Sequence, residues 1–304
     1  MTDITTTSPA IPKAPDVSTT DNPTTTLAVP AVRQRRSILV IFSIIWLTAL
    51  ILAAVFANLL PIAPYDVPVG APRLSPAFGS LDLLLGTDTF GRSELSRIIY
   101  GARVSLVIGT VAGLFGFIIG SLIGLTGGYF GRQLDSGISL IADAMLAFPP
   151  LILLLALASI FQPSAATILF GLTLVVIPAF IRLSRANALA WSSREFVRAA
   201  KNMGAGHSRI LFKEILPNVL APLAAYLPIV MAALIVAEGS LSFLGLGIPP
   251  PTPSWGGMIS EGKDALSTSP HLVFVPATAI FFTVFSLNQL GDHLRTKFDK
   301  TIGH

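Results

Sequence analysis

The 304-residue chain is 52% hydrophobic and only 12% charged, with a mean hydropathy of +0.74. Soluble domains carry about 25% charged residues, so the excess apolar surface must face lipid. The absence of cysteine excludes disulfides and thiolate chemistry, and the absence of a P-loop sequence leaves the chain without that kind of ATP site. Four scattered histidines give no support for a metal site. The net charge of +4 is explained by loops that orient membrane helices, so it requires no nucleic acid.

The N-terminal third begins with a polar arm and continues into a membrane span. Residues 1–32 are rich in Thr, Pro, Ser and Ala, which predicts a disordered cytoplasmic arm. Three arginines, at 33, 35 and 36, then precede a long uncharged run. That run exceeds the apolar region of a signal peptide, which is about 7–15 residues. We therefore expect a retained first helix over Ser37–Leu60, followed by an external segment, so that 33–102 forms one region.

The last part of the external segment contains the signals that begin a second helix. Gly86-Thr87-Asp88 is typical of a turn, with Asp88 or Thr89 placed to cap the helix that follows. Leu95, Ile98 and Ile99 then form a short apolar stripe. This pattern predicts an interfacial helix that lies along the membrane before the second span.

The second span, predicted over Val104–Gly131, carries glycines at intervals of three or four residues. In lipid, small residues at this spacing let two helix backbones approach closely. We expect these glycines to serve helix packing, and the alternative is that they line a substrate path. They are Gly109, Gly113, Gly116, Gly120 and Gly124.

The next apolar stretch, Ala144–Ile181, is 38 residues long and uncharged. A helix of that length would extend about 57 Å, nearly twice the hydrocarbon core, so it must hold two spans. We expect these spans over Ser136–Phe161 and Ala165–Leu183. Asp143, at the start of the first, lacks an evident charged partner within the bilayer. A packing or interfacial role is therefore expected for it, with a proton relay as the alternative.

A basic stretch follows, with seven basic and two acidic residues between Arg182 and Glu214. Within it, 193–203 reads as a short helix that Ser193 can cap, with Glu195 in its first turn. Its apolar face carries small side chains, and glycines at 204 and 206 end it. One interpretation is a loop whose charge only fixes membrane orientation. The other is a helix that docks into a groove of another protein. The face consists of Phe196, Ala199, Ala200 and Met203.

Two more spans are expected, over Ile215–Ala237 and Leu272–Gly291, which makes six in total. Glu238 ends the fifth span, either as a carboxylate at the headgroup level, which we favour, or as a residue of the translocation path together with Ser242. Trp255 suits an interfacial position. Apart from Lys13, the proposed inside segments hold 14 basic residues and the outside segments hold 5, which places both termini in the cytoplasm.

Four stretches carry a resemblance to a known family. The basic stretch resembles the "EAA" loop of permease subunits in bacterial ABC importers, roughly E-A-A-x3-G-x9-I-x-L-P. Arg198 and Glu214 depart from that pattern. Residues 84–106, 143–149 and 239–262 resemble the C-type permease subunit of dipeptide and oligopeptide importers. The positions that match the loop pattern are Ala199, Ala200, Gly204, Leu216 and Pro217.

This resemblance implies an all-α membrane protein with the type I ABC importer permease fold: six transmembrane helices and a cytoplasmic coupling helix. The permease core would cover 103–292 and a cytoplasmic tail 293–304. The chain would sit in the bacterial cytoplasmic membrane and perform no covalent chemistry. The residues implied in coupling to an ATPase are Glu195, Arg198, Ala199, Ala200, Gly204, Leu216 and Pro217.

The implied partners are a second, homologous permease, two ABC ATPases that use ATP and Mg²⁺, an extracellular solute-binding protein and a peptide substrate. This chain itself would bind no cofactor. Related subunits would import nickel chelates, haem or oligosaccharides, which is the alternative within this class. An ion-coupled secondary transporter would require paired intramembrane charges or inverted repeats with broken helices, and the sequence shows neither. A membrane enzyme would require an acid–base pair or a nucleophile constellation, which is also not evident.

Overall fold

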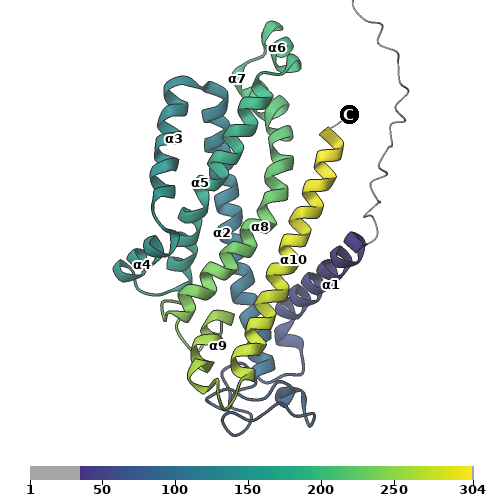
Figure 1. Cartoon of the computed structure of the whole chain (residues 1–304), viewed down its shortest axis with the longest axis vertical. Helices are drawn as coiled ribbons and strands as arrows, with labels where there is room; N and C mark the ends of the chain where they lie inside the picture. Colours follow the sequence, from purple (N-terminus) through teal and green to yellow (C-terminus); the bar gives the residue numbers. More distant parts are fainter. Residues whose placement is uncertain (1–34, 303–304) are drawn as a thin grey trace, which may run out of the picture.

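The computed structural model describes residues 35–302 and shows an elongated helical bundle (Figure 1). Helices α2, α5, α8 and α10 run along its long axis, and α1 leans against α10. The loop with α6 and α7 lies at one end, and α9 lies at the other. The helices are α1 (Arg35–Val55), α2 (Glu94–Phe130), α3 (Arg132–Ala147), α4 (Pro150–Ile160), α5 (Ala165–Ser192), α6 (Glu195–Asn202), α7 (His207–Arg209), α8 (Leu216–Phe243), α9 (Trp255–Gly262) and α10 (His271–Ile302).

Five of these elements are long and apolar enough to cross a membrane, and the count becomes six if α3 and α4 form one bent span. The expected third helix, Ser136–Phe161, is therefore wrong as a single straight helix: α3 and α4 meet at 83°. The cause is local. Pro149 and Pro150 lack backbone N–H groups, and a residue before proline is pushed out of the helical region. Phe148 accordingly has an extended backbone, with ψ of 127°.

The expected interfacial helix before the second span is also wrong as a separate element. Helix α2 runs without a break from Glu94 to Phe130, which is about 55 Å at 1.5 Å per residue. Its N-terminal cap is Ser93, whose Oγ accepts a hydrogen bond from the Ser96 N–H. Asp88 does not cap it; its Oδ1 accepts hydrogen bonds from the N–H groups of Phe90 and Arg92 within the preceding turn. The predicted arm 1–32 lies outside the described residues.

The contact between α2 and α5 is the most extensive helix–helix contact in the bundle. Gly116, Gly120 and Gly124 of α2 face α5, while Gly109 and Gly113 face α8. A methyl group added at Gly120 would lie 2.6 Å from the Phe180 Cβ and 2.7 Å from the Ile177 carbonyl oxygen. The glycine stripe therefore lets α2 contact two neighbouring helices at backbone distance.

Two ion pairs join α3 to α5. Arg185 pairs with Asp135, and the Arg182 Nη2 lies 2.6 Å from the Asp143 Oδ1. Asp143 thus has a basic partner, contrary to the expectation from the sequence. The partner was missed because it is 39 residues away in the chain and belongs to the next span.

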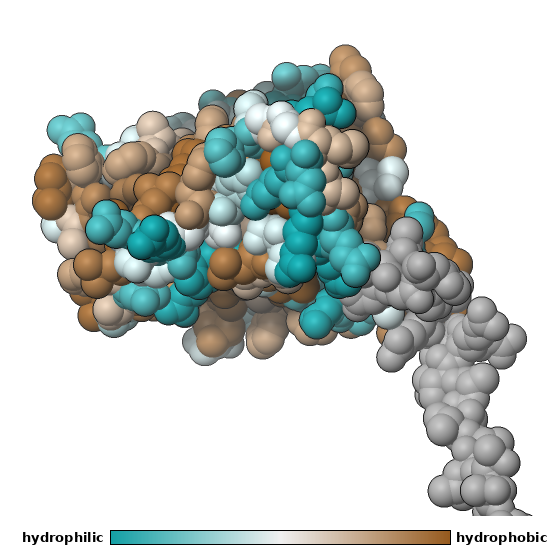
Figure 2. Space-filling model, turned by 90° about the horizontal axis from the view of Figure 1, so that it is seen from above, coloured by the Kyte–Doolittle hydropathy of each residue, from teal (hydrophilic) through white to brown (hydrophobic). Residues whose placement is uncertain are grey.

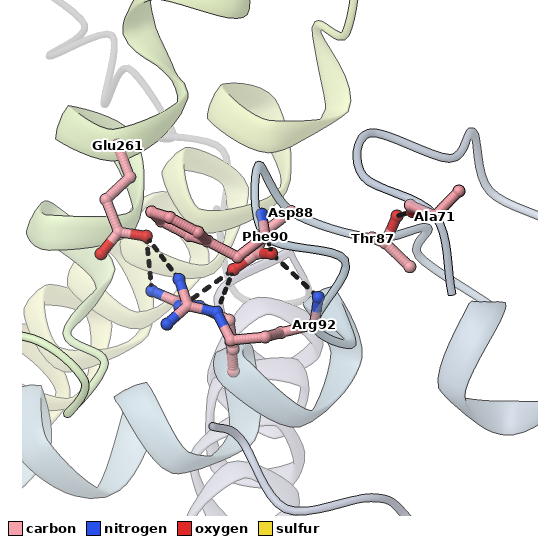
Figure 3. Close-up of polar contacts among 7 residues, drawn as sticks. Ala71, Thr87, Asp88, Phe90, Arg92 and Glu261 are labelled. Carbon is pink, nitrogen blue, oxygen red and sulfur yellow. Dashed lines mark hydrogen bonds and ion pairs between the residues drawn. The ribbon is translucent and has the colours of Figure 1, made fainter. Parts of the chain in front are cut away.

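The end of the bundle with α9 is held by a clasp, which we define as Asp88, Arg92, Arg97 and Glu261; Figure 3 labels Asp88, Arg92 and Glu261. The Arg92 Nε and the Arg97 Nη1 lie 2.6 and 3.0 Å from the Asp88 Oδ2. The same two guanidinium groups lie 3.0 and 2.8 Å from the Glu261 Oε2. The clasp joins the start of α2 to α9. Trp255 of α9 adds to this contact: it is fully buried against the rest of the chain, and its Nε1 donates to the Ile98 carbonyl oxygen.

Replacing Gly120 by Val should destabilise the protein, because the new side chain meets the backbone of α5. Overpacking of this kind costs about 1–3 kcal/mol. Gly137→Val is the matched control, since nothing lies within 4 Å of a Cβ added at that helical glycine. The thermal unfolding midpoint of the purified protein in detergent measures the difference. Equal midpoints for the two variants would contradict the close approach of α2 and α5.

Replacing Arg97 by Met should open the clasp. Arg97 is 1% exposed, and its loss leaves Arg92 as the one cation shared by the Asp88 and Glu261 carboxylates, which lowers the stability of the clasp. Limited proteolysis of 244–270, together with the unfolding midpoint, reports the change. Arg73→Met, at an exposed position of the same external segment, should alter neither. Unchanged protease resistance in Arg97→Met would show that the ion pairs of Arg97 do not hold α9 in place.

Candidate functional site

The cytoplasmic loop predicted from the basic stretch consists of α6, a glycine turn and α7. Gly204 ends α6 with a positive φ of 79°, which only glycine adopts without strain. The Ala205 N–H donates to the Ala200 carbonyl oxygen and the Gly204 N–H to that of Lys201, which is the Schellman arrangement. Ser193 does not cap the helix as expected. Its Oγ donates to the Ala190 carbonyl oxygen, and Arg194 occupies the cap position without a side-chain hydrogen bond.

The faces of α6 differ from the sequence interpretation at one residue. Ala199 and Gly204 are exposed, but Ala200 is only 7% exposed and packs with Val197 into the interior of this chain. Phe196 and Met203 are 40% and 81% exposed, which is unusual for large apolar side chains. The exposed apolar surface of α6 therefore consists of Phe196, Ala199 and Met203, and Ala200 anchors the helix from below.

The loop is fastened to the end of α2 by aromatic contacts. The Tyr129 hydroxyl and the His207 Nδ1 form a hydrogen bond of 2.8 Å. The Lys201 Nζ lies 5.1 Å from the centroid of the same tyrosine ring, a cation–π distance. Sequence reasoning missed Tyr129 and His207, because they are 78 residues apart and belong to no common motif.

The other residues implied in coupling lie on either side of this surface. Glu195 and Arg198 are exposed on α6, while Leu216 and Pro217 begin α8 after a π-helical turn over Ile210–Ile215. Leu216 is half-buried against the core and Pro217 is exposed. Figure 2 views this end of the molecule, where hydrophilic residues are prominent among hydrophobic ones.

Glu238 and Ser242 lie near the opposite end of α8 and face the interior. Glu238 is 1% exposed. Its Oε1 accepts a hydrogen bond from the Ser242 Oγ at 2.7 Å, and its Oε2 accepts one from the Ser105 Oγ at 3.0 Å. The Ser254 Oγ donates in turn to that of Ser242. The carboxylate thus connects α2, α8 and the turn before α9, rather than lying at the surface.

Within residues 35–302, no group of three or more His, Asp or Glu side chains is placed to hold a metal ion. The described residues provide a loop with an exposed apolar surface, and polar connections between long apolar helices. The exposed apolar surface suits contact with a partner protein, and the polar contacts between helices suit a membrane protein whose helices move relative to one another.

Comparison with known proteins agrees with this assignment. The family described as "Binding-protein-dependent transport system inner membrane component" matches residues 105–304. The chain is 38% identical over 265 residues to the "Dipeptide transport system permease protein DppC" of Alkalihalophilus pseudofirmus, covering 87% of this chain and 86% of the relative. The protein of the same name from Haemophilus influenzae is 38% identical over 265 residues, covering 84% and 90%. The "Glutathione transport system permease protein GsiD" of Pectobacterium atrosepticum is 38% identical over 215 residues, covering 71% of each chain.

A solved structure of the MetNI methionine ABC transporter, in inward-facing conformations, contains a similar fold. The TM-score is 0.56 at 20% identity, and the alignment covers 66% of this chain and 95% of that one. At this identity the likeness concerns the fold alone, and it agrees with the expected type I permease architecture. The chain belongs to the family of binding-protein-dependent transport system inner membrane components, as a permease subunit of an ABC importer.

Proposed function

We propose that this chain is one of two permease subunits of an importer that carries dipeptides or oligopeptides into the cytoplasm. The observation that carries the proposal is the match to dipeptide permeases over almost the whole chain, including the external segment before residue 105, where the family match begins. The glutathione permease relatives support the same substrate class, because glutathione is itself a small peptide. The chain contributes the path and no covalent chemistry.

The proposed energy source is a pair of ABC ATPases, which hold ATP and Mg²⁺ and bind the loop formed by α6 and α7. The exposed surface of Phe196, Ala199 and Met203 supports this, since an unpartnered apolar face on a cytoplasmic loop suits burial in a protein groove. The distribution of basic residues supports cytoplasmic termini. A solute-binding protein would deliver peptide at the end with α9. Glu238 and Ser242 are proposed to couple α2 and α8 beside the outer part of the path.

The test is ATP-dependent uptake by the reconstituted complex. Vesicles that contain this chain, its partner permease and both ATPases should accumulate a labelled dipeptide when ATP and the solute-binding protein are supplied. Nickel chelate, haem and oligosaccharide serve as competing solutes. Vesicles with this chain alone, without ATP, should not accumulate peptide under a proton or sodium gradient. Accumulation by that single chain would overturn the importer assignment, and uptake of a competing solute instead of peptide would overturn the substrate class.

Ala199→Asp should weaken ATPase binding while leaving the fold of the chain intact. The carboxylate would be exposed in the free chain but would have to be buried without a partner in the ATPase groove, at a cost of several kcal/mol. Ala200→Asp should instead destabilise the loop itself, since Ala200 is buried in this chain. Gly204→Val should distort the turn, because a left-handed backbone costs a branched residue about 1–2 kcal/mol.

Arg198→Glu is the matched control for that experiment. It places a carboxylate on the exposed side of the same helix and restores the residue usual in the family pattern, so binding should be retained. Co-purification of the ATPases and the ratio of uptake to ATP hydrolysis measure the outcome. Normal association and coupling in Ala199→Asp would contradict the docking surface.

A further inference from the structure

A polar stripe runs along α3, on the side that faces α5. Asp135, Ser139 and Asp143 are spaced four residues apart and so share one helix face. Arg185 and Arg182 of α5 pair with the two carboxylates. The remainder of α3 is largely apolar and exposed, with Leu140 and Ile141 at 71% and 62%. The stripe is therefore the polar part of an otherwise lipid-compatible helix.

The inner pair of this stripe, Asp143 and Arg182, lies in the cytoplasmic half of the two spans. Asp143 is eleven residues from the start of α3, and Arg182 is ten residues from the end of α5. At 1.5 Å per residue, they lie about 16.5 and 15 Å from the cytoplasmic ends of their helices. The hydrocarbon core is about 30 Å thick, and α5 extends about 42 Å, so α5 exceeds the core by about 12 Å. If α5 crosses the whole core, Arg182 lies about 3–15 Å inside its cytoplasmic boundary, in the cytoplasmic half of the apolar layer.

The inner pair is nevertheless open on the surface of this chain. The side chains of Arg182 and Asp143 are 60% and 57% exposed, against 33% and 17% for Arg185 and Asp135. The Arg182 Nε and Nη2 both donate to the Asp143 Oδ1, at 3.3 and 2.6 Å. Within residues 35–302, the Asp143 Oδ2 accepts no hydrogen bond, and the Arg182 Nη1 donates none. Each partner therefore keeps a free polar end directed away from the pair.

Open charges at this depth restrict what can lie against them. Charged side chains within membrane spans face the bundle interior, a water-filled cavity or another protein, and very rarely lipid. The α3–α5 contact does not require this pair, because the less exposed Asp135–Arg185 pair already joins the two helices. The surface around Asp143 and Arg182 must therefore meet water or the partner permease.

We propose that Asp143 and Arg182 line the aqueous translocation path and form a contact site for the charged ends of the peptide. The free end of Arg182 would bind the α-carboxylate, and the free oxygen of Asp143 would bind the α-ammonium group. A peptide with free termini carries one group of each charge, which matches the pair. This inference rests on the proposed peptide substrate for its ligand, but not for its position in the path.

Accessibility to a water-borne reagent tests the position. Because the chain has no cysteine, Asp143→Cys and Arg182→Cys each introduce a thiol that is unique within this chain, and labelling is read from this chain after the subunits are separated. A charged, membrane-impermeant thiol reagent should label both, and dipeptide with its binding protein should slow that labelling. Ile141→Cys is the control: it is exposed, but lies on a different face of α3 and should resist the reagent. Failure to label both positions, or equal labelling of position 141, would overturn the path assignment.

Uptake by charge variants tests the contact. Arg182→Gln should lower the uptake of a dipeptide with a free carboxylate about tenfold, the size of one lost charge-assisted hydrogen bond. The same variant should affect a C-amidated dipeptide much less. Arg185→Gln removes an ion pair of the same chemistry outside the proposed contact, and should leave the ratio of the two uptake rates as in the wild type.

The exchange of both charges distinguishes substrate contact from a structural ion pair. Asp143→Arg combined with Arg182→Asp rebuilds the pair but reverses its direction, so uptake should stay low. Recovery to the wild-type rate would show that the pair is only structural and would overturn the contact. If the wild-type complex imports no peptide at all, the proposed function fails and the peptide contact fails with it. The labelling result still decides whether the pair lines a path.

Discussion

The close contact of α2 with α5 and α8 is the constraint on which the rest of the structure depends. In lipid, apolar side chains gain little by leaving their surroundings, so helices associate through close packing and polar contacts. The glycine stripe of α2 brings the backbones of α2 and α5 together around Ile177 and Phe180. This contact sets the position of α5, and thereby the position of Arg182, Arg185 and the loop that follows.

The two ends of α2 show how one rigid helix connects distant functions. At its N-terminal end, Arg97 and Arg92 hold α9 through Glu261. At its C-terminal end, Tyr129 contacts Lys201 and His207 of the loop with α6 and α7. An unbroken helix of about 55 Å joins these two sets of contacts.

The third predicted span behaves differently from the others. Prolines at 149 and 150 break it, α4 turns away at 83°, and α3 contacts the bundle mainly through α2 and α5. Figure 1 shows α3 and α4 on the side of α5 away from α10. The surface of α3 and α4 therefore has an apolar part, formed by their exposed apolar residues, and a charged part, formed by Asp143 and Arg182. One part suits lipid or a second permease, and the other suits water.

The sequence by itself determined the class of fold and most of the functional assignment. Uncharged runs of sufficient length indicated the spans, because a membrane segment must be apolar over about 20 residues. The helix, glycine turn and helix of the loop with α6 and α7 followed from local rules, since glycine accepts the positive φ of a helix C-terminus without steric cost. The resemblance of short motifs indicated an importer subunit of the peptide type, and the full-length relatives agree.

Only the tertiary structure decided which side chains meet. The partners Asp143 and Arg182 are 39 residues apart, Arg97 and Glu261 are 164 apart, and Tyr129 and His207 are 78 apart, so no local pattern relates them. The same holds for the faces of α6: Ala199 and Ala200 are adjacent and alike in sequence, and only the packing of Val197 against the bundle turns Ala200 inward. Helical periodicity defines a face, but the helices that surround it determine whether that face meets protein, water or lipid.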